Sequence, residues 1–214
     1  MIRLALWSVA LAAVVVVLSP AREVSAGIPT DQLKGAIDRV VKTLEDPALK
    51  GEGKLPERRR AIRKVADDIF DFTEISRRAL ARHWQGLSEK QRDEFVGLFA
   101  DLLERSYISK IELYGGEKIV YANERVDGDV ATVGTKIITK NGTDVPVDYR
   151  MAKRGPRWLV YDVNIEGVSL VSNYRTQFNK IIQTASYDEL VQKLRNKQEE
   201  LTAEEQPKAT PVKK

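Results

Sequence analysis

The stretch of sequence that determines the fold is Val130-Ala-Thr-Val-Gly-Thr-Lys-Ile-Ile-Thr-Lys-Asn-Gly-Thr-Asp-Val-Pro-Val-Asp-Tyr-Arg-Met-Ala152. Apolar side chains recur at every second position on both sides of Asn141-Gly142, which is the period of a half-buried strand. Asn-Gly between two alternating runs is a strong hairpin signal, because both residues tolerate the positive φ of a tight turn. The stretch therefore predicts two antiparallel strands, each with one buried face.

The same pattern extends to both sides of this hairpin. Asp127-Gly128 precedes it and Arg154-Gly155-Pro156 follows it, and each of these turn sequences joins it to another run rich in β-branched and aromatic residues. The four predicted strands are 118–123, 130–139, 144–152 and 157–165. Consecutive strands with short joints predict an antiparallel meander, with one face buried and one face in water.

Amphipathic helices are predicted before and after these strands. The clearest begins at a capping box, Ser88-Glu89-Lys90-Gln91, and runs to Tyr114-Gly115-Gly116. The others run from Thr30 or Asp31 to Glu45, from Glu57 towards Trp84 with a kink or restart at Asp71-Phe72-Thr73, from Val168 to Ile182, and onward from a second capping box at Ser186 and Glu189. The sequence thus predicts an α+β fold in which helices cover one face of a curved four-stranded sheet.

The first 26 residues are typical of a secretory signal peptide. Arg3 precedes the uncharged apolar run Leu4 to Leu18, and Val24-Ser25-Ala26 suits cleavage after Ala26. The run is shorter than the roughly 20 residues of a bilayer-spanning helix, although an uncleaved anchor remains the alternative. Because no later run reaches that length, the exported protein is expected to be soluble. Residues 205–214 carry prolines and lysines and predict a disordered tail, which leaves 27–204 as a single domain.

Composition excludes several functions. The 35 lysines and arginines nearly balance 31 acidic residues, without the dense basic stripe of a nucleic-acid-binding protein. The absence of cysteine excludes disulfides, thiol catalysis and thiolate metal sites. His83 is the only histidine, so we expect it to be structural and predict no metal site. The basic residues Arg58 to Lys64 are expected to form an ordinary solvated helix face, with docking to an acidic membrane or protein partner as the alternative.

No catalytic constellation is visible. Strand alternation directs Asp148 and Asp162 to solvent, whereas a catalytic carboxyl group must be buried or paired, so we expect no catalytic role for these residues or for Glu166. Ser169 lacks the Gly-x-Ser-x-Gly surroundings of a nucleophile elbow. We therefore predict neither catalytic residues nor a cofactor.

The segment Tyr161-Asp-Val-Asn-Ile-Glu-Gly-Val-Ser-Leu-Val-Ser-Asn-Tyr-Arg-Thr-Gln-Phe178 resembles the signature of the MlaC (toluene-tolerance auxiliary) family. Further matching features are Trp84, Leu87-Ser88, Gln91, Phe95, Phe99, Tyr107, Val147-Asp148-Tyr149-Arg150 and Trp158. The resemblance extends from about Thr30 to Leu194.

This resemblance implies a monomeric periplasmic carrier that shuttles a phospholipid between an outer-membrane lipid complex and an inner-membrane ABC transporter complex. Its acyl chains would lie in an apolar pocket between sheet and helices. Because each methylene moved from lipid into water costs about 0.8 kcal/mol, two chains of roughly 15 methylenes need a dry cavity. Alternation and helix spacing would place these residues in its lining: Phe99, Tyr107, Val133, Ile137, Val147, Tyr149, Val163, Tyr174 and Phe178.

Three alternatives stay open at this point. Some members of the family are associated with hopanoids, which need the same apolar lining as acyl chains. An enzyme on a cone-shaped α+β scaffold would have to use Tyr149 or Tyr161, for which no paired base is visible. An adaptor of a membrane transport complex, which binds no lipid, predicts a filled core.

Overall fold

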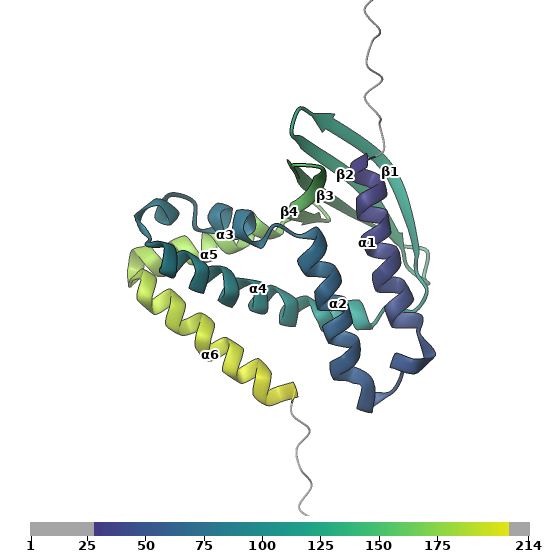
Figure 1. The fold of residues 1–214 in the computed structure, drawn as a ribbon, viewed down its shortest axis with the longest axis horizontal. Helices are drawn as coiled ribbons and strands as arrows, with labels where there is room; N and C mark the ends of the chain where they lie inside the picture. Colours follow the sequence, from purple (N-terminus) through teal and green to yellow (C-terminus); the bar gives the residue numbers. More distant parts are fainter. Residues whose placement is uncertain (1–27, 206–214) are drawn as a thin grey trace, which may run out of the picture.

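The computed structural model describes residues 28–205, so the predicted signal peptide and residues 206–214 of the predicted tail lie outside the described residues. Helices and strands follow the predicted order (Figure 1). The helices are α1 (Ile28–Glu45), α2 (Leu55–Ile69), α3 (Phe72–Leu80), α4 (Glu89–Glu112), α5 (Leu170–Thr184) and α6 (Tyr187–Glu205). The strands are β1 (Lys118–Asp127), β2 (Val130–Ile138), β3 (Asp144–Arg154), β4 (Arg157–Ile165) and β5 (Val168–Ser169). None of the described helices is long and apolar enough to cross a membrane.

The strands form one antiparallel sheet in the order β1-β2-β3-β4-β5, which confirms the predicted meander. The sheet has one more strand than predicted, because Val168 and Ser169 were expected to open a helix. Glu166 and Gly167 both have positive φ, at 51° and 84°, and this tight turn folds β5 back onto Asn164 and Ile165 of β4. Helix α5 therefore begins only at Leu170.

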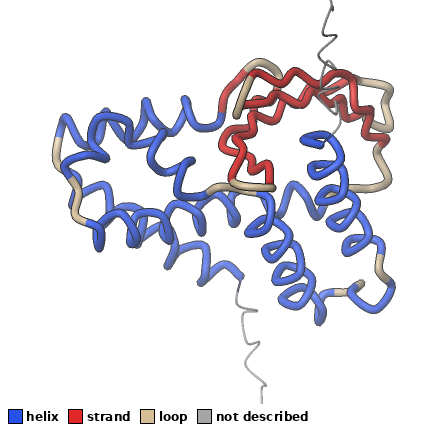
Figure 2. Tube along the Cα trace, turned by 45° about the horizontal axis from the view of Figure 1, so that its top comes forward, coloured by secondary structure: helices blue, strands red, loops and turns tan. Residues whose placement is uncertain are grey.

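Two irregularities shape the sheet. The pairing of β1 with β2 shifts between Tyr121 and Asn123, and the pairing of β3 with β4 shifts between Arg150 and Met151. Bulges of this kind bend a strand and increase its twist. Figure 2 shows the result, a sheet that curves over helix α1 and so has a concave inner face.

The chain breaks between α2 and α3 as the sequence predicted. Helix α2 ends at Ile69, and Phe70 pairs with Val160 of β4 in an isolated parallel bridge. The Asp71 backbone N–H donates to the Val160 carbonyl, and the Asp71 carboxylate accepts from the Glu74 N–H to cap α3. The capping box at Ser88 is likewise confirmed. The start of α1 differs, because the helix already includes Thr30, whose N–H and hydroxyl both donate to Glu124 of β1.

The apolar core is divided into two clusters. The sheet cluster lies between the concave face and helices α1 and α2, and its buried members are Leu33, Ala36, Val65, Ile69, Ala131, Val133, Met151, Trp158 and Val160. The helical cluster joins α3, α4, α5 and α6, and its buried members are Ile75, Ala79, Leu80, Phe95, Phe99, Leu103, Val171, Phe178, Leu190 and Leu194. Phe70 packs against both. Because a domain of this size usually has one contiguous core, the division marks the boundary between the clusters as a place to look for a ligand.

Candidate functional site

The concave face of the sheet brings together all five of the predicted strand residues. Val133 of β2 lies opposite Tyr149 of β3, which lies opposite Val163 of β4. In the next rows Thr135 faces Val147, and Ile137 faces Val145. The predicted alternation is therefore correct for the face of each strand.

The four predicted helix residues lie together in the helical cluster instead. The Phe99 ring lies 5.0 Å from both Tyr174 and Phe178, measured between ring centroids. Phe99 and Phe178 are buried, whereas Tyr107 and Tyr174 are half-buried and pack against the buried members. The structure thus brings the nine predicted residues together as two groups rather than as one continuous wall.

Among the described residues, part of the concave face belongs to neither the sheet cluster nor the helical cluster. We call Ile119, Ile137, Val145, Val147 and Ile165 the apolar strip. Sheet register places these five residues at the end of the face where β1 and β3 begin. Val147 is buried and the other four are half-buried. A row of large apolar side chains that no core cluster includes is a surface that apolar ligand atoms can cover.

Neutral hydroxyl groups lie beside the apolar strip. Tyr121 of β1 pairs with Thr135 of β2, next to Tyr149 of β3. Burial raises the pKa of Tyr121 and of Tyr149 to about 12, and for Tyr149 a hydrogen bond with Thr135 opposes the rise. The Thr135 hydroxyl donates to the Val147 carbonyl at 2.9 Å. These hydroxyl groups are therefore uncharged at physiological pH, which suits an apolar ligand.

The two tyrosines that were candidates for an enzyme lie in different parts of the structure. Tyr149 lies on the concave face, whereas Tyr161 packs against the helical cluster with the Arg78 guanidinium 4.0 Å from its ring centroid. His83 is half-buried and its Nε2 lies 3.0 Å from Asn179 Oδ1. Among the described residues, no group of three or more His, Asp or Glu side chains is placed to hold a metal ion.

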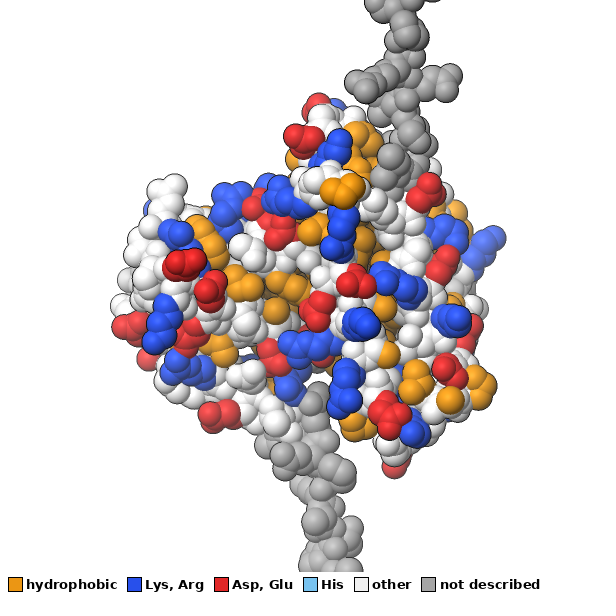
Figure 3. Space-filling view, in the orientation of Figure 1, with side chains coloured by type: hydrophobic (Ala, Val, Ile, Leu, Met, Phe, Trp, Pro, Cys, Tyr) orange, Lys and Arg blue, Asp and Glu red, His pale blue; other side chains and the backbone are white. Residues whose placement is uncertain are grey.

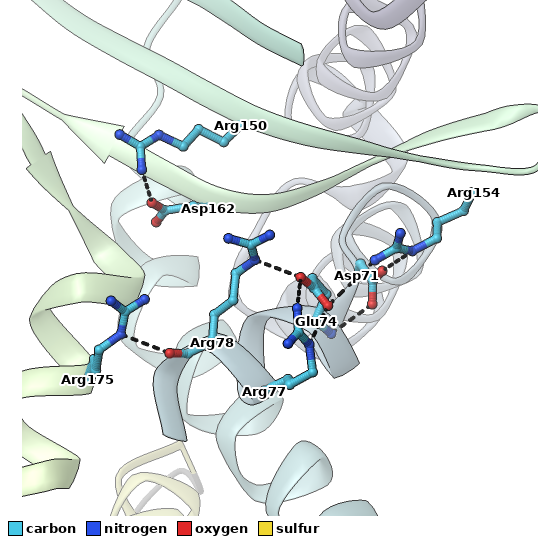
Figure 4. A network of polar contacts seen from close by, with 8 residues as sticks. All are labelled: Asp71, Glu74, Arg77, Arg78, Arg150, Arg154, Asp162 and Arg175. Carbon is cyan, nitrogen blue, oxygen red and sulfur yellow. Dashed lines mark hydrogen bonds and ion pairs between the residues drawn. The ribbon is translucent and has the colours of Figure 1, made fainter. Parts of the chain in front are cut away.

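Asp162 is the clearest correction to the sequence analysis. It does point away from the concave face, as alternation predicted, but it is only 4% exposed rather than in solvent. Strand β5 and the first turn of α5 fold over it. Its carboxylate accepts from the Ser169 hydroxyl at 2.7 Å and from the Val171 N–H at 3.0 Å, and Arg150 lies 3.5 Å away (Figure 4). Asp162 thus fixes the start of α5 to the sheet.

Glu74 is the centre of an ion-pair network that the sequence analysis missed. The buried carboxylate accepts two hydrogen bonds from Arg77, at 2.6 and 2.8 Å, and one from Arg78 at 2.7 Å (Figure 4). Arg154 of β3 lies 3.6 Å from it and donates to Asp71. Hydrogen bonds from Arg77, the larger cause, and from Arg78 lower the pKa of Glu74 to about 2, against the opposing effect of burial. The spacing Glu74, Arg77, Arg78 was the available signal, since residues three and four apart meet on a helix.

The basic face of α2 is largely engaged within the chain. Arg58 and Arg59 pair with Glu112 of α4 at 3.2 and 2.9 Å. Arg63 pairs with Glu104 of α4 at 2.7 Å. The expectation of a solvated face is therefore wrong for Arg58 and Arg59, whose side chains are only 17% and 21% exposed, whereas Arg63 is 44% exposed despite its ion pair with α4. Figure 3 shows positive and negative side chains interspersed across the visible face of the molecule.

A cavity of about 520 Å³ opens elsewhere, where α1 and α2 meet the start of β4. Its lining is Asp31, Gln32, Gly35, Ala36, Arg39, Asp68, Ile69, Arg157 and Trp158. It contains none of the nine predicted residues, and five of its nine lining residues carry polar side chains. Its chemistry suits water better than an acyl chain.

Comparison with known proteins relates this fold and face to one family. The family model described as "MlaC protein" matches residues 34–196. The chain is 24% identical over 139 residues to the intermembrane phospholipid transport system binding protein MlaC of Haemophilus influenzae. It is 26% identical over 136 residues to the toluene tolerance protein ttg2D of Pseudomonas putida. These alignments cover 61% and 60% of this chain, and 64% and 60% of the two relatives.

A solved structure agrees with the sequence comparisons. The phospholipid-binding protein of Ralstonia solanacearum, solved in complex with a phospholipid, superposes with a TM-score of 0.72 and 27% identity. The superposition covers 81% of this chain and 98% of that one. Since the family model spans most of the described residues and the fold agrees, this chain belongs to the MlaC family.

Proposed function

We propose that this protein is a periplasmic lipid carrier that binds a phospholipid against the concave face of its sheet, between the sheet cluster and the helical cluster. The acyl chains would cover the apolar strip and the half-buried residues beside it, Tyr107, Tyr149, Val163 and Tyr174. The buried residues Phe99, Val133 and Phe178 would form the layer behind them.

The observation that carries this proposal is the divided core. Two apolar clusters meet at Phe70, and the apolar strip lies outside both of them. Each half-buried Ile or Val in the strip gains from being covered, because removing apolar surface from water contributes about 25 cal/mol per Å². A lipid brings that cover and leaves its own chains dry, whereas the charged headgroup can stay in water at the edge.

The relatives support the choice of phospholipid as ligand. The name of the Haemophilus influenzae protein assigns it to intermembrane phospholipid transport, and the Ralstonia solanacearum protein was solved with a phospholipid. The carrier would receive its lipid from one membrane complex and deliver it to another, the two being an outer-membrane lipid complex and an inner-membrane ABC transporter. The N-terminal 26 residues would direct it to the periplasm and be removed there.

A blocked binding face tests the proposal. Ile137→Trp adds a large ring at a half-buried position of the apolar strip, and Val130→Trp adds the same ring at an exposed position of β2 as the matched control. Both variants would be exported from a bacterial host, stripped of lipid and incubated with vesicles of bacterial phospholipid, and loading would be measured by native mass spectrometry.

The proposal expects Ile137→Trp to unfold at a urea concentration close to wild type and to load no lipid, while Val130→Trp loads normally. Two results would contradict it. Wild-type loading by Ile137→Trp would place the lipid elsewhere. A loss of about 1–3 kcal/mol in the free energy of unfolding would indicate a filled core that is overpacked by the ring, as a non-binding adaptor requires.

A further inference from the structure

We infer that the Tyr121 hydroxyl donates a hydrogen bond to an ester carbonyl of the bound lipid and thereby makes the protein select ester-linked acyl lipids over lipids without a carbonyl group. This inference rests on the proposed function and names the chemical class of the ligand. It also separates the two cargoes that sequence leaves open, because the ring system of a hopanoid is hydrocarbon.

The position of Tyr121 on β1 is fixed by its surroundings. It pairs with Thr135, and the register shift that follows it makes Ala122 the extra residue of a bulge, so that Tyr121 and Glu124 both face inward. The Oε2 atom of Glu124 accepts from the N–H and the hydroxyl of Thr30 of α1 at 2.8 and 2.5 Å. Tyr121 thus lies on the concave face, on the same side of β1 as a glutamate that binds α1.

The Tyr121 hydroxyl is buried and has no hydrogen-bond partner among the described residues. Buried polar groups in proteins are almost always paired, and each exception needs an explanation. Phenylalanine would fill the same space without that cost. A donor retained here is explained if its acceptor arrives with a ligand.

Neighbouring hydroxyls do not share this property. Thr135 donates to the Val147 carbonyl, and Tyr149 interacts with Thr135. The other two unpaired side-chain atoms among the described residues are on Ser76 of α3 and Asn164 of β4. Register pairs Asn164 with Asp148, away from the concave face, and Ser76 belongs to a helix outside the sheet cluster. Tyr121 is therefore the unpaired donor that this face offers.

The environment of Tyr121 keeps it a donor. Burial, the larger cause, together with the charge of Asp38, raises its pKa to about 12, so the phenol stays protonated throughout the physiological range. Asp38 itself pairs with Lys34 at 2.5 Å. The phosphate of a diacyl phospholipid stays with the headgroup in water. The hydrogen-bond acceptors that lie next to its acyl chains, and so can enter an apolar space, are the carbonyl groups of its ester linkages.

A comparison of ester with ether lipids tests the inference. Lipid-free protein would be incubated with mixed vesicles that contain diacyl and dialkyl phosphatidylglycerol of equal chain length, and the ratio of bound lipids would be read by native mass spectrometry. These lipids have the same headgroup and chains and differ only in the carbonyl groups. Wild type should prefer the diacyl lipid by about two- to ten-fold, the range that one neutral hydrogen bond supplies.

Tyr121→Phe should bind the dialkyl lipid as wild type does and lose the preference, with a melting temperature equal to or above that of wild type. Tyr187→Phe is the matched control, because the Tyr187 hydroxyl donates to the Gln91 carbonyl between α6 and α4, away from the concave face, and this variant should keep the preference. A wild-type protein that binds both lipids equally, or a Tyr121→Phe variant that keeps the preference, would overturn the inference. A wild-type protein that binds neither lipid would instead overturn the proposed function, so the two failures are distinguishable.

Discussion

Replacing Glu74 by glutamine is the sharpest perturbation of the network that holds the helices to the sheet. Glu74→Gln keeps the shape of the side chain and one carbonyl acceptor but removes the negative charge that three arginines share. Arg77 and Arg78 belong to α3 and Arg154 to β3, so the substitution weakens the joint between the two parts of the molecule that flank the candidate site.

The magnitude follows from the lowered pKa. A fall from 4.5 to about 2 corresponds to about 3 kcal/mol of preference for the folded state. The side chains of Arg77, Arg78 and Arg154 are 51%, 36% and 47% exposed, so solvent screens part of that energy. We therefore expect Glu74→Gln to lose about 2 kcal/mol, which lowers the melting temperature by roughly 4–8 °C for a domain of this size.

The pH dependence gives the prediction its sign. Because the pKa of Glu74 is lowered on folding, its contribution is complete above the usual pKa of 4.5 and is lost as pH falls towards about 2. Urea unfolding of both proteins from about pH 7 to about pH 3 should show a difference between wild type and Glu74→Gln that is constant above about pH 5.5 and less than half as large at about pH 3. A difference near zero at neutral pH, or one that does not change with pH, would refute this account of Glu74.

Three further predictions concern other contacts, each measured by urea unfolding. Asp162→Ala leaves the Val171 N–H and the Ser169 hydroxyl unpaired and should cost about 1–3 kcal/mol, and an unchanged midpoint would mean that the start of α5 is held otherwise. Phe178→Ala opens a cavity among the helical aromatic rings and should cost about 3–5 kcal/mol, whereas less than about 1 kcal/mol would indicate a loosely packed cluster. Ser88→Ala removes the capping box of α4 and should lower the free energy of unfolding by about 1 kcal/mol. Ser172→Ala, at an exposed position of α5, is the control and should leave it unchanged.

Local signals in the sequence predicted most of the fold. The Asn141-Gly142 turn, the alternation around it and the capping box at Ser88 each depend on residues within a few positions of one another, and the structure contains all three. The break at Asp71 was predictable for the same reason, because an aspartate can cap the helix that follows it.

Features that depend on tertiary packing could not be predicted in this way. Alternation placed Asp162 on the correct face, but its burial depends on β5 and α5 folding over that face. Likewise, the sequence predicted a solvated helix face at Arg58 and Arg59. Their partner, Glu112, lies more than fifty residues away on α4, so no local pattern indicated the pairing.

The candidate site shows the same limit. Periodicity assigned Val133, Ile137, Val147, Tyr149 and Val163 to one face, and register agrees. It gave no signal that the helix residues Phe99 and Phe178 pack into a separate cluster, nor that Tyr121 carries an unpaired buried hydroxyl. Both features arise from contacts between distant elements, where side-chain spacing along one element carries no information.

The most direct test of the carrier function is native mass spectrometry of the protein purified from the periplasm of a bacterial host after export of the full chain, with organic extraction of the same sample. The account predicts a protein mass with discrete adducts and a diacyl phospholipid in the extract. A clean mass without adducts, together with no loading from added phospholipid vesicles, would contradict it.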